Sequence, residues 1–205
     1  MTDNELLLRR VVVSGFGFIY WAGVLVQARR VRKKIGRSPN LKPRGTKEKV
    51  LWLGWLLVIG AWMGQGFVNG STTAWAACRF WVEALSPVSL AVGLGLTVAG
   101  YASTLWCYAA MGDAWRIGIN SGEKNALVNR GPYRFVRHPI YLFQIVMLAG
   151  GVLLLPTVLS CAILLVHLVC VLIKALDEET YLLSVHGDVY RDFMTKTGRL
   201  LPKFW

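Results

Sequence analysis

The feature that most constrains this chain is a series of apolar runs, each about as long as a bilayer core is thick. They cover roughly residues 11–28, 50–68, 87–111, 140–155 and 156–176. A helix needs about 20 apolar residues to cross roughly 30 Å of hydrocarbon. The sequence therefore predicts an all-α integral membrane protein with about five transmembrane helices.

The last two runs are expected to form a helical hairpin. They share about 36 residues, so each arm of about 18 barely spans the bilayer at roughly 1.5 Å per residue. Two tilted spans and a shorter re-entrant pair both fit this length. The turn is expected at Leu155, Pro156 and Thr157, because proline begins a helix well and continues one poorly.

Positive charge predicts the orientation. The net charge is +12, and residues 29–49 contain ten Lys or Arg and a single acid, Glu48. Basic loops between apolar runs mark the cytoplasmic side, so this excess indicates contact with membrane lipids and not with nucleic acid. With an odd number of spans, the segments 112–139 and 177–205 then share the cytosolic face of the cell membrane with this loop.

The whole chain, 1–205, is expected to be a single membrane domain. Its first part, 1–110, supplies spanning helices, and 111–205 holds the residues suited to chemistry. Residues 71–86 mix aromatic and charged side chains and predict an interfacial helix or a plain loop on the outer face. Gly60 and Gly64, four residues apart, predict a close helix contact, and His167 is the one ionisable residue expected deep in a span.

The first chemical cluster precedes the fourth run. Between residues 115 and 141 the sequence places Arg, His, Pro and Tyr residues directly ahead of an apolar helix that Pro139 begins. The amino end of that helix has unpaired N–H groups and a positive dipole end, which favour an anionic group such as a carboxylate. A basic loop with interfacial tyrosines would explain the arginines equally well, but His138 fits that reading less easily.

The second cluster follows the last run. Lys174 and Glu178 are four residues apart and so share a helix face, and Asp177, Glu178 and Glu179 are consecutive acids. Charged residues at the end of a span can simply reach the interface. Three acids on a basic side of the protein are unusual, however, and would suit the ammonium group of an amino-acid-like cofactor.

Both clusters resemble the isoprenylcysteine carboxyl methyltransferase and phospholipid methyltransferase family over about 95 residues. The resemblance implies a membrane enzyme that uses S-adenosyl-L-methionine at a cytosolic cofactor pocket. The implied cofactor-binding residues are Asn125, Ala126, Leu127, Val128, Tyr133, His138, Pro139, Ile140, Tyr141 and Glu178. Lys174 falls where the isoprenylcysteine enzymes place an arginine for the acceptor carboxylate, and Glu179 is a second acid; both are candidate catalytic residues. No metal site is expected.

Two departures from the family pattern affect the acceptor. Lys174 keeps a charge but lacks the two-point grip of arginine on a carboxylate, and Asn125 replaces a histidine of the eukaryotic enzymes. The expected acceptor is therefore lipophilic or small and membrane-partitioned: an isoprenylcysteine-like carboxylate, a phospholipid amine or a thiol. A thiol or an ammonium acceptor also needs a base, for which Asp177 and Glu179 are candidates.

Two other functions remain open from the sequence. One is an NADPH-dependent membrane reductase, because sterol reductases resemble this family in their C-terminal region. The other is a non-enzymatic membrane protein, such as a sensor or a transporter subunit. A soluble-type methyltransferase is disfavoured, because the sequence lacks a glycine-rich strand–turn–helix pattern.

Overall fold

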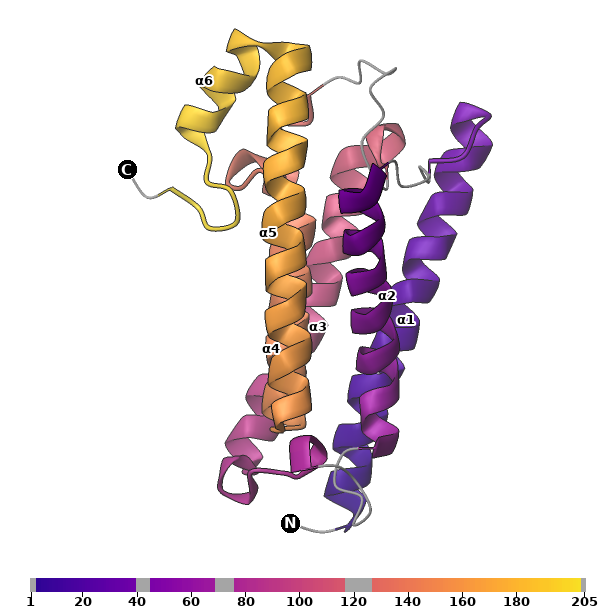
Figure 1. Cartoon of the computed structure of the whole chain (residues 1–205), viewed down its shortest axis with the longest axis vertical. Helices are drawn as coiled ribbons and strands as arrows, with labels where there is room; N and C mark the ends of the chain where they lie inside the picture. The colour runs from indigo at the N-terminus through magenta and orange to yellow at the C-terminus, as the bar shows by residue number, and fades with distance from the viewer. Residues whose placement is uncertain (1–2, 40–44, 69–75, 117–126, 204–205) are drawn as a thin grey trace.

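The computed structural model describes residues 3–39, 45–68, 76–116 and 127–203, and within these ranges the chain is almost wholly helical. Figure 1 shows the long helices side by side along one axis, which confirms the all-α prediction. The main helices are α1 (Asp3–Ile35), α2 (Gly45–Val68), α3 (Pro87–Met111), α4 (Pro139–Leu154), α5 (Val158–His186) and α6 (Asp188–Lys196).

Among the described residues, four helices are long and apolar enough to cross a membrane: α1, α2, α3 and α5. The fifth apolar helix, α4, has 16 residues, so it extends about 24 Å at 1.5 Å per residue and is shorter than the hydrocarbon core. The predicted hairpin is present, and its first arm is the shorter of the two. The turn lies where the sequence predicted it, but α5 has 29 residues because it continues beyond the apolar run into the acidic cluster.

Small residues allow α3 and α4 to pack closely. A Cβ atom added to Gly93 would lie 3.0 Å from the backbone oxygen of Gly150, and one added to Gly100 would lie 2.8 Å from that of Phe143. In α2 the close contact is at Gly66, where a Cβ would lie 2.7 Å from a backbone oxygen of α1. The contact predicted at Gly60 and Gly64 is wrong, because an added Cβ would meet no atom within 4 Å at either position.

The turn between α4 and α5 is fixed by hydrogen bonds. The Thr157 hydroxyl accepts from the backbone N–H of Ser160 and caps α5. The backbone N–H of Trp81 donates to the Pro156 carbonyl at 2.9 Å. Where residues 71–86 are described, they form two short 3₁₀ helices, Ala76–Cys78 and Val82–Ala84, in place of one interfacial helix.

Arg9 is a buried charge that the sequence analysis missed. Helix α1 begins at Asp3, before the expected start of the first span, and Arg9 lies within it with 0% of its surface exposed. Its guanidinium pairs with Glu5 at 2.8 Å and donates to backbone carbonyls that include Ser86 and Leu154. His167 is thus not the single ionisable residue buried among the spans.

The residues of both chemical clusters lie at the opposite end of the molecule from Arg9. At that end α1 and α5 finish and α2 and α4 begin, as Figure 1 shows. Lys34 pairs with Asp113 at 3.0 Å, and Lys47 of the basic region pairs with Asp177. The prediction that the two clusters share one face with the basic loop is confirmed for the described residues.

Candidate functional site

The segment before α4 turns His138 toward the interior. A short 3₁₀ helix, η4 (Gly131–Arg134), begins at Gly131 with φ of 59°, a conformation that glycine adopts at little cost. It buries Tyr133, which is 7% exposed. Pro139 is the first residue of α4, and His138 is its N-cap residue and also 7% exposed. Local turn chemistry thus places both side chains at the amino end of a helix.

The C-terminal segment holds this turn in place. Val136 and Gly198 form a parallel β-bridge. The backbone N–H of Arg137 donates to the Gly198 carbonyl at 2.8 Å, and that of His138 donates to the Arg199 carbonyl at 3.1 Å. The backbone of His138 is therefore fixed by residues some 60 positions later in the chain.

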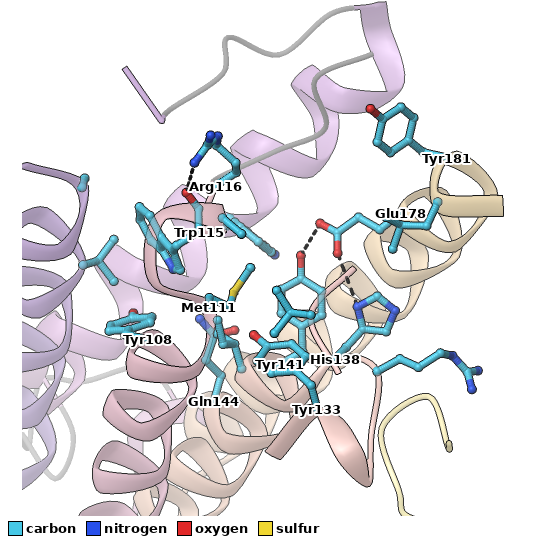
Figure 2. Close-up of a pocket in the computed structure, with 18 of the residues that line it drawn as sticks. Tyr108, Met111, Trp115, Arg116, Tyr133, His138, Tyr141, Gln144, Glu178 and Tyr181 are labelled. Atoms are coloured by element: carbon cyan, nitrogen blue, oxygen red, sulfur yellow. Dashed lines mark hydrogen bonds and ion pairs between the residues drawn. The ribbon is translucent and has the colours of Figure 1, made fainter. Parts of the chain in front are cut away.

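Glu178 joins the two clusters. The Tyr141 hydroxyl donates to Oε1 of Glu178 at 2.8 Å, and Nδ1 of His138 lies 3.4 Å from Oε2. The rings of His138 and Tyr141 are stacked, with centroids 5.6 Å apart and planes inclined by 12°. Figure 2 shows Glu178 reaching from α5 toward these two side chains. The carboxylate of Glu178 therefore holds His138 and Tyr141 in place at the amino end of α4.

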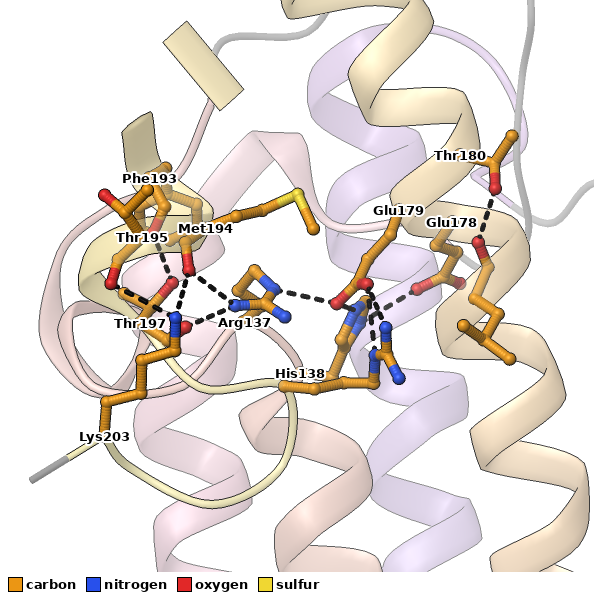
Figure 3. Close-up of polar contacts among 12 residues, drawn as sticks. Arg137, His138, Glu178, Glu179, Thr180, Phe193, Met194, Thr195, Thr197 and Lys203 are labelled. Carbon is orange, nitrogen blue, oxygen red and sulfur yellow. Dashed lines mark hydrogen bonds and ion pairs between the residues drawn. The ribbon is translucent and has the colours of Figure 1, made fainter. Parts of the chain in front are cut away.

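Glu179 lies behind this group and pairs with two arginines. Its Oε1 accepts from Nε of Arg137 at 2.7 Å, and its Oε2 accepts from Nη2 of Arg199 at 2.8 Å (Figure 3). Its side chain is 4% exposed. Arg137 also donates to the Thr197 carbonyl. Both carboxylate oxygens are thus engaged, and Glu179 connects α5 to the segment before α4 and to the C-terminal segment after α6.

The two acids favour a charged His138. Burial opposes the charge on the imidazole, but Glu178 and Glu179, each 3.4 Å from a ring nitrogen, outweigh it and raise the pKa of His138 above its usual value. Burial also raises the pKa of Tyr133 well above its usual value, so this phenol stays neutral. The site therefore combines an imidazole whose charged form is favoured, two acidic side chains and a neutral phenol.

These residues border a cavity of about 490 Å³. Ligand pockets commonly enclose about 300–1,000 Å³. Its lining comes from α1, α2, α3, α4, α5, α6 and the segments between them, and most of it is aromatic or aliphatic. The lining residues with polar or aromatic groups include Tyr20, Trp21, Trp52, Trp55, Tyr108, Trp115, Arg116, Tyr133, Arg137, His138, Tyr141, Gln144, Glu178, Tyr181, His186 and Tyr190.

The structure brings most of the predicted cofactor residues to this cavity. Those that line it are Leu127, Val128, Tyr133, His138, Ile140, Tyr141 and Glu178. Pro139 does not line the cavity but is buried as the first residue of α4. Asn125 and Ala126 lie outside the described residues. Lys174 and Glu179, the two candidate catalytic residues, are not among the residues that line it.

The sequence analysis did not predict that α1 and α2 contribute one wall of the cavity. Tyr20 and Trp21 of α1 line the cavity together with Trp52 and Trp55 of α2. Trp52 and Trp55 are three residues apart and so share a helix face, a signal that could have indicated a lined surface. Gln144, a single amide within an apolar run, was a second such signal.

The comparison with known families concerns the same helices. Residues 92–184 match the isoprenylcysteine carboxyl methyltransferase (ICMT) family. The predicted resemblance is therefore confirmed, and this part of the chain carries the sequence pattern of a family of membrane methyltransferases. The matched range runs from within α3 to near the end of α5 and includes His138, Tyr141 and Glu178. The wall from α1 and α2 and the segment that carries Arg199 lie outside it.

A curated protein is also similar to this chain. It is the nickel-cobalt-cadmium resistance protein NccN of Alcaligenes xylosoxydans xylosoxydans, which is 28% identical over 120 residues. The alignment covers 58% of this chain and 52% of NccN. The chain therefore matches about half the length of that relative.

Proposed function

We propose that this protein is an integral membrane methyltransferase that takes its methyl group from S-adenosyl-L-methionine and transfers it to a lipophilic or small membrane-partitioned acceptor. The observation that carries the proposal is that Tyr133, His138 and Glu178, from two clusters separated by a helical hairpin, border one cavity. Had they faced separate environments, there would be no common site for a donor. The match of residues 92–184 to the ICMT family supports the same reaction class.

The residues at the outer end of the cavity fit the chemical groups of the donor. The carboxylate of Glu178 would attract its ammonium group, and the amino end of α4 would attract its carboxylate. The aromatic faces of Tyr133 and Tyr141 would contact the adenine ring or the charged sulfur. The donor supplies a methyl group bonded to a positively charged sulfur, and the chain has mainly to align the two reactants and exclude water.

The inner part of the cavity suits a lipophilic acceptor. Leu25, Leu56 and Ile59 line it together with the tryptophans of α1 and α2. Both helices are long and apolar enough to cross a membrane. A charged donor that arrives from the cytosol and an acceptor that arrives from the bilayer can therefore meet at the boundary between the two. We place this end of the protein on the cytosolic side of the cell membrane, because the basic region lies there.

The test is to compare two cofactor ligands on the detergent-purified chain. S-adenosylhomocysteine, the demethylated donor, is expected to raise the thermal unfolding temperature, and NADPH is expected to leave it unchanged. A ligand that binds only the folded state stabilises it by RT ln(1 + [L]/Kd), where [L] is the free ligand concentration. Stabilisation by NADPH alone would contradict the proposal and favour an NADPH-dependent membrane reductase. Stabilisation by neither ligand would favour a non-enzymatic membrane protein.

A further inference from the structure

The cavity has two chemically different parts. Within the described residues, five basic or acidic side chains line the cavity: Arg116, Arg137, His138, Glu178 and His186. They come from segments outside α1, α2, α3 and α4, and we call their part of the cavity its outer end. The inner part is formed by α1, α2, α3 and the first turns of α4, and the lining residues from these helices carry no formal charge. An acceptor that enters this part therefore meets amide, phenol and indole groups.

Gln144 is the amide of this inner part. It lies on α4 three residues after Tyr141, so both side chains share a helix face, and Figure 2 shows Gln144 on the far side of Tyr141 from Glu178. Gln144 is 8% exposed and lines the cavity. Its Nε2 donates to the hydroxyl of Tyr20 of α1, which is 2% exposed. This hydrogen bond fixes the amide across the two helices.

The second polar atom of Gln144 is its carbonyl oxygen, Oε1. This atom is buried and accepts no hydrogen bond from the described residues. A buried acceptor left without a donor costs free energy, and buried polar groups are nearly always paired. Oε1 of Gln144 therefore lies at the cavity wall without a donor from the described residues, between the proposed donor-binding residues and the apolar wall of α1 and α2.

We propose that the methyl acceptor supplies this partner: it is a lipophilic molecule whose nucleophilic atom carries a hydrogen and no charge, a thiol or a hydroxyl, and it donates to Oε1 of Gln144. This inference rests on the proposed methyltransferase function and names the acceptor class. Gln144 is then a residue that determines acceptor specificity, a role that neither the family match nor the motifs assign.

The same geometry disfavours the two charged acceptors. A carboxylate has no hydrogen to donate and would bring a negative charge into the uncharged part of the cavity, away from its arginines. Lys174, the expected partner of such a carboxylate, does not line the cavity. An ammonium can donate, but it has no lone pair for the methyl carbon, and its charge repels that of the donor sulfur.

The transfer to such an acceptor balances in atoms and electrons. The acceptor atom forms a bond to the methyl carbon, and the bond from that carbon to the donor sulfur breaks with both electrons remaining on sulfur. The acceptor atom loses its proton to water. Glu178, the one carboxylate that lines the cavity within the described residues, already accepts from Tyr141 and lies on the far side of Tyr141 from Gln144.

The test uses C10 ligands on the full chain in detergent, saturated with S-adenosylhomocysteine. Binding of 1-decanethiol, 1-decanol, methyl decyl sulfide and decanoate is measured by thermal stabilisation across a concentration series. The thiol or the alcohol is expected to bind at least about tenfold more tightly than the sulfide, which lacks the hydrogen, and than decanoate. Transfer of labelled methyl from the donor then distinguishes thiol from hydroxyl.

Two variants assign the preference to Gln144. Gln144→Met keeps the approximate volume, removes the amide and is expected to abolish the preference over the sulfide. Gln144→Leu should do the same. Gln65→Leu is the matched control, because Gln65 is a buried amide of α2 that contacts Ser160 and does not line the cavity. It should keep the preference.

The outcomes distinguish a failure of the acceptor assignment from a failure of the proposed methyltransferase function. Tightest binding of decanoate, or a preference that persists in Gln144→Met, would overturn the acceptor assignment while binding of S-adenosylhomocysteine still supports a methyltransferase. Failure of the wild-type chain to bind S-adenosylhomocysteine would overturn the proposed function and this inference together. The wild-type ligand series decides the question even if both Gln144 variants fail to fold.

Discussion

Each end of this molecule pairs a buried arginine side chain with an acid, and the two ends differ in whether the neighbouring polar groups all find partners. At the end with the α4–α5 turn, Arg9 pairs with Glu5 and donates to three backbone carbonyls, those of Ser86, Leu153 and Leu154. At the other end, Arg137 and Arg199 saturate Glu179, but the buried Oε1 of Gln144 accepts no hydrogen bond from the described residues. The guanidinium of Arg9 thus finds its hydrogen-bond partners within the protein, whereas the polar groups at the other end border a cavity.

The difference gives a physical criterion for reading buried polar groups in a membrane protein. A charge whose hydrogen bonds are all made by the protein stabilises one arrangement of helices. A polar group that lines a cavity and lacks a partner costs stability unless a ligand completes it. Arg9 therefore indicates a structural contact, and Gln144 indicates a binding site. Four variants test this contrast.

The largest effect is expected for Arg9→Leu. Removing a buried charge leaves Glu5 and the end of α4 without their partner, which costs about 3–5 kcal/mol in comparable buried pairs. Denaturant unfolding in detergent would measure the loss. The affinity of the remaining folded protein for S-adenosylhomocysteine should equal that of the wild type, so a weaker affinity would contradict a purely structural role.

Glu179→Gln is the counterpart at the cavity end. Losing the charge that faces Arg137 and Arg199 is expected to cost about 1.5–3 kcal/mol of folding free energy. Arg137 is adjacent to His138, so its displacement should also disturb the cofactor site. The affinity for S-adenosylhomocysteine should therefore fall together with the folding free energy. If Glu179 were a catalytic base instead, turnover would fall while affinity and unfolding stayed at the wild-type values.

Glu178→Gln should change ligand binding more than stability. We expect affinity for S-adenosylhomocysteine to fall about tenfold, because the ammonium loses its counter-charge. Isothermal titration would measure it. Asp177→Asn is the matched control, since the neighbouring acid pairs with Lys47 and does not line the cavity; an equal loss in the control would remove the specific role of Glu178.

The smallest effect is expected from pH. Since Glu178 and Glu179 raise the pKa of His138, its charged form stabilises the folded state below its ordinary pKa of about 6.5, and this contribution is lost as pH rises through the raised value. The difference in unfolding temperature between the wild type and His138→Gln should therefore shrink with rising pH. A difference that grows with pH would show that His138 is neutral in the folded protein.

The sequence by itself determined the membrane class, the approximate bounds of the helices and the location of the proposed donor site. Apolar runs, proline at the start of α4 and the turn at Pro156 are local features, so their consequences can be read within a few residues. The order of the motifs around His138 and Glu178 likewise identified the side chains that meet at the cavity, because the ICMT-like pattern spans both.

The tertiary structure decided the rest, since it depends on how helices pack. The hydrogen bond from Gln144 to Tyr20 joins residues 124 positions apart, and the cavity wall from α2 depends on the packing register of whole helices. Glu179 became a partner of two arginines, and Lys174 stayed off the cavity, although both belong to the same motif. Local sequence indicates which groups are unusual, but only packing determines which of them remain without a partner.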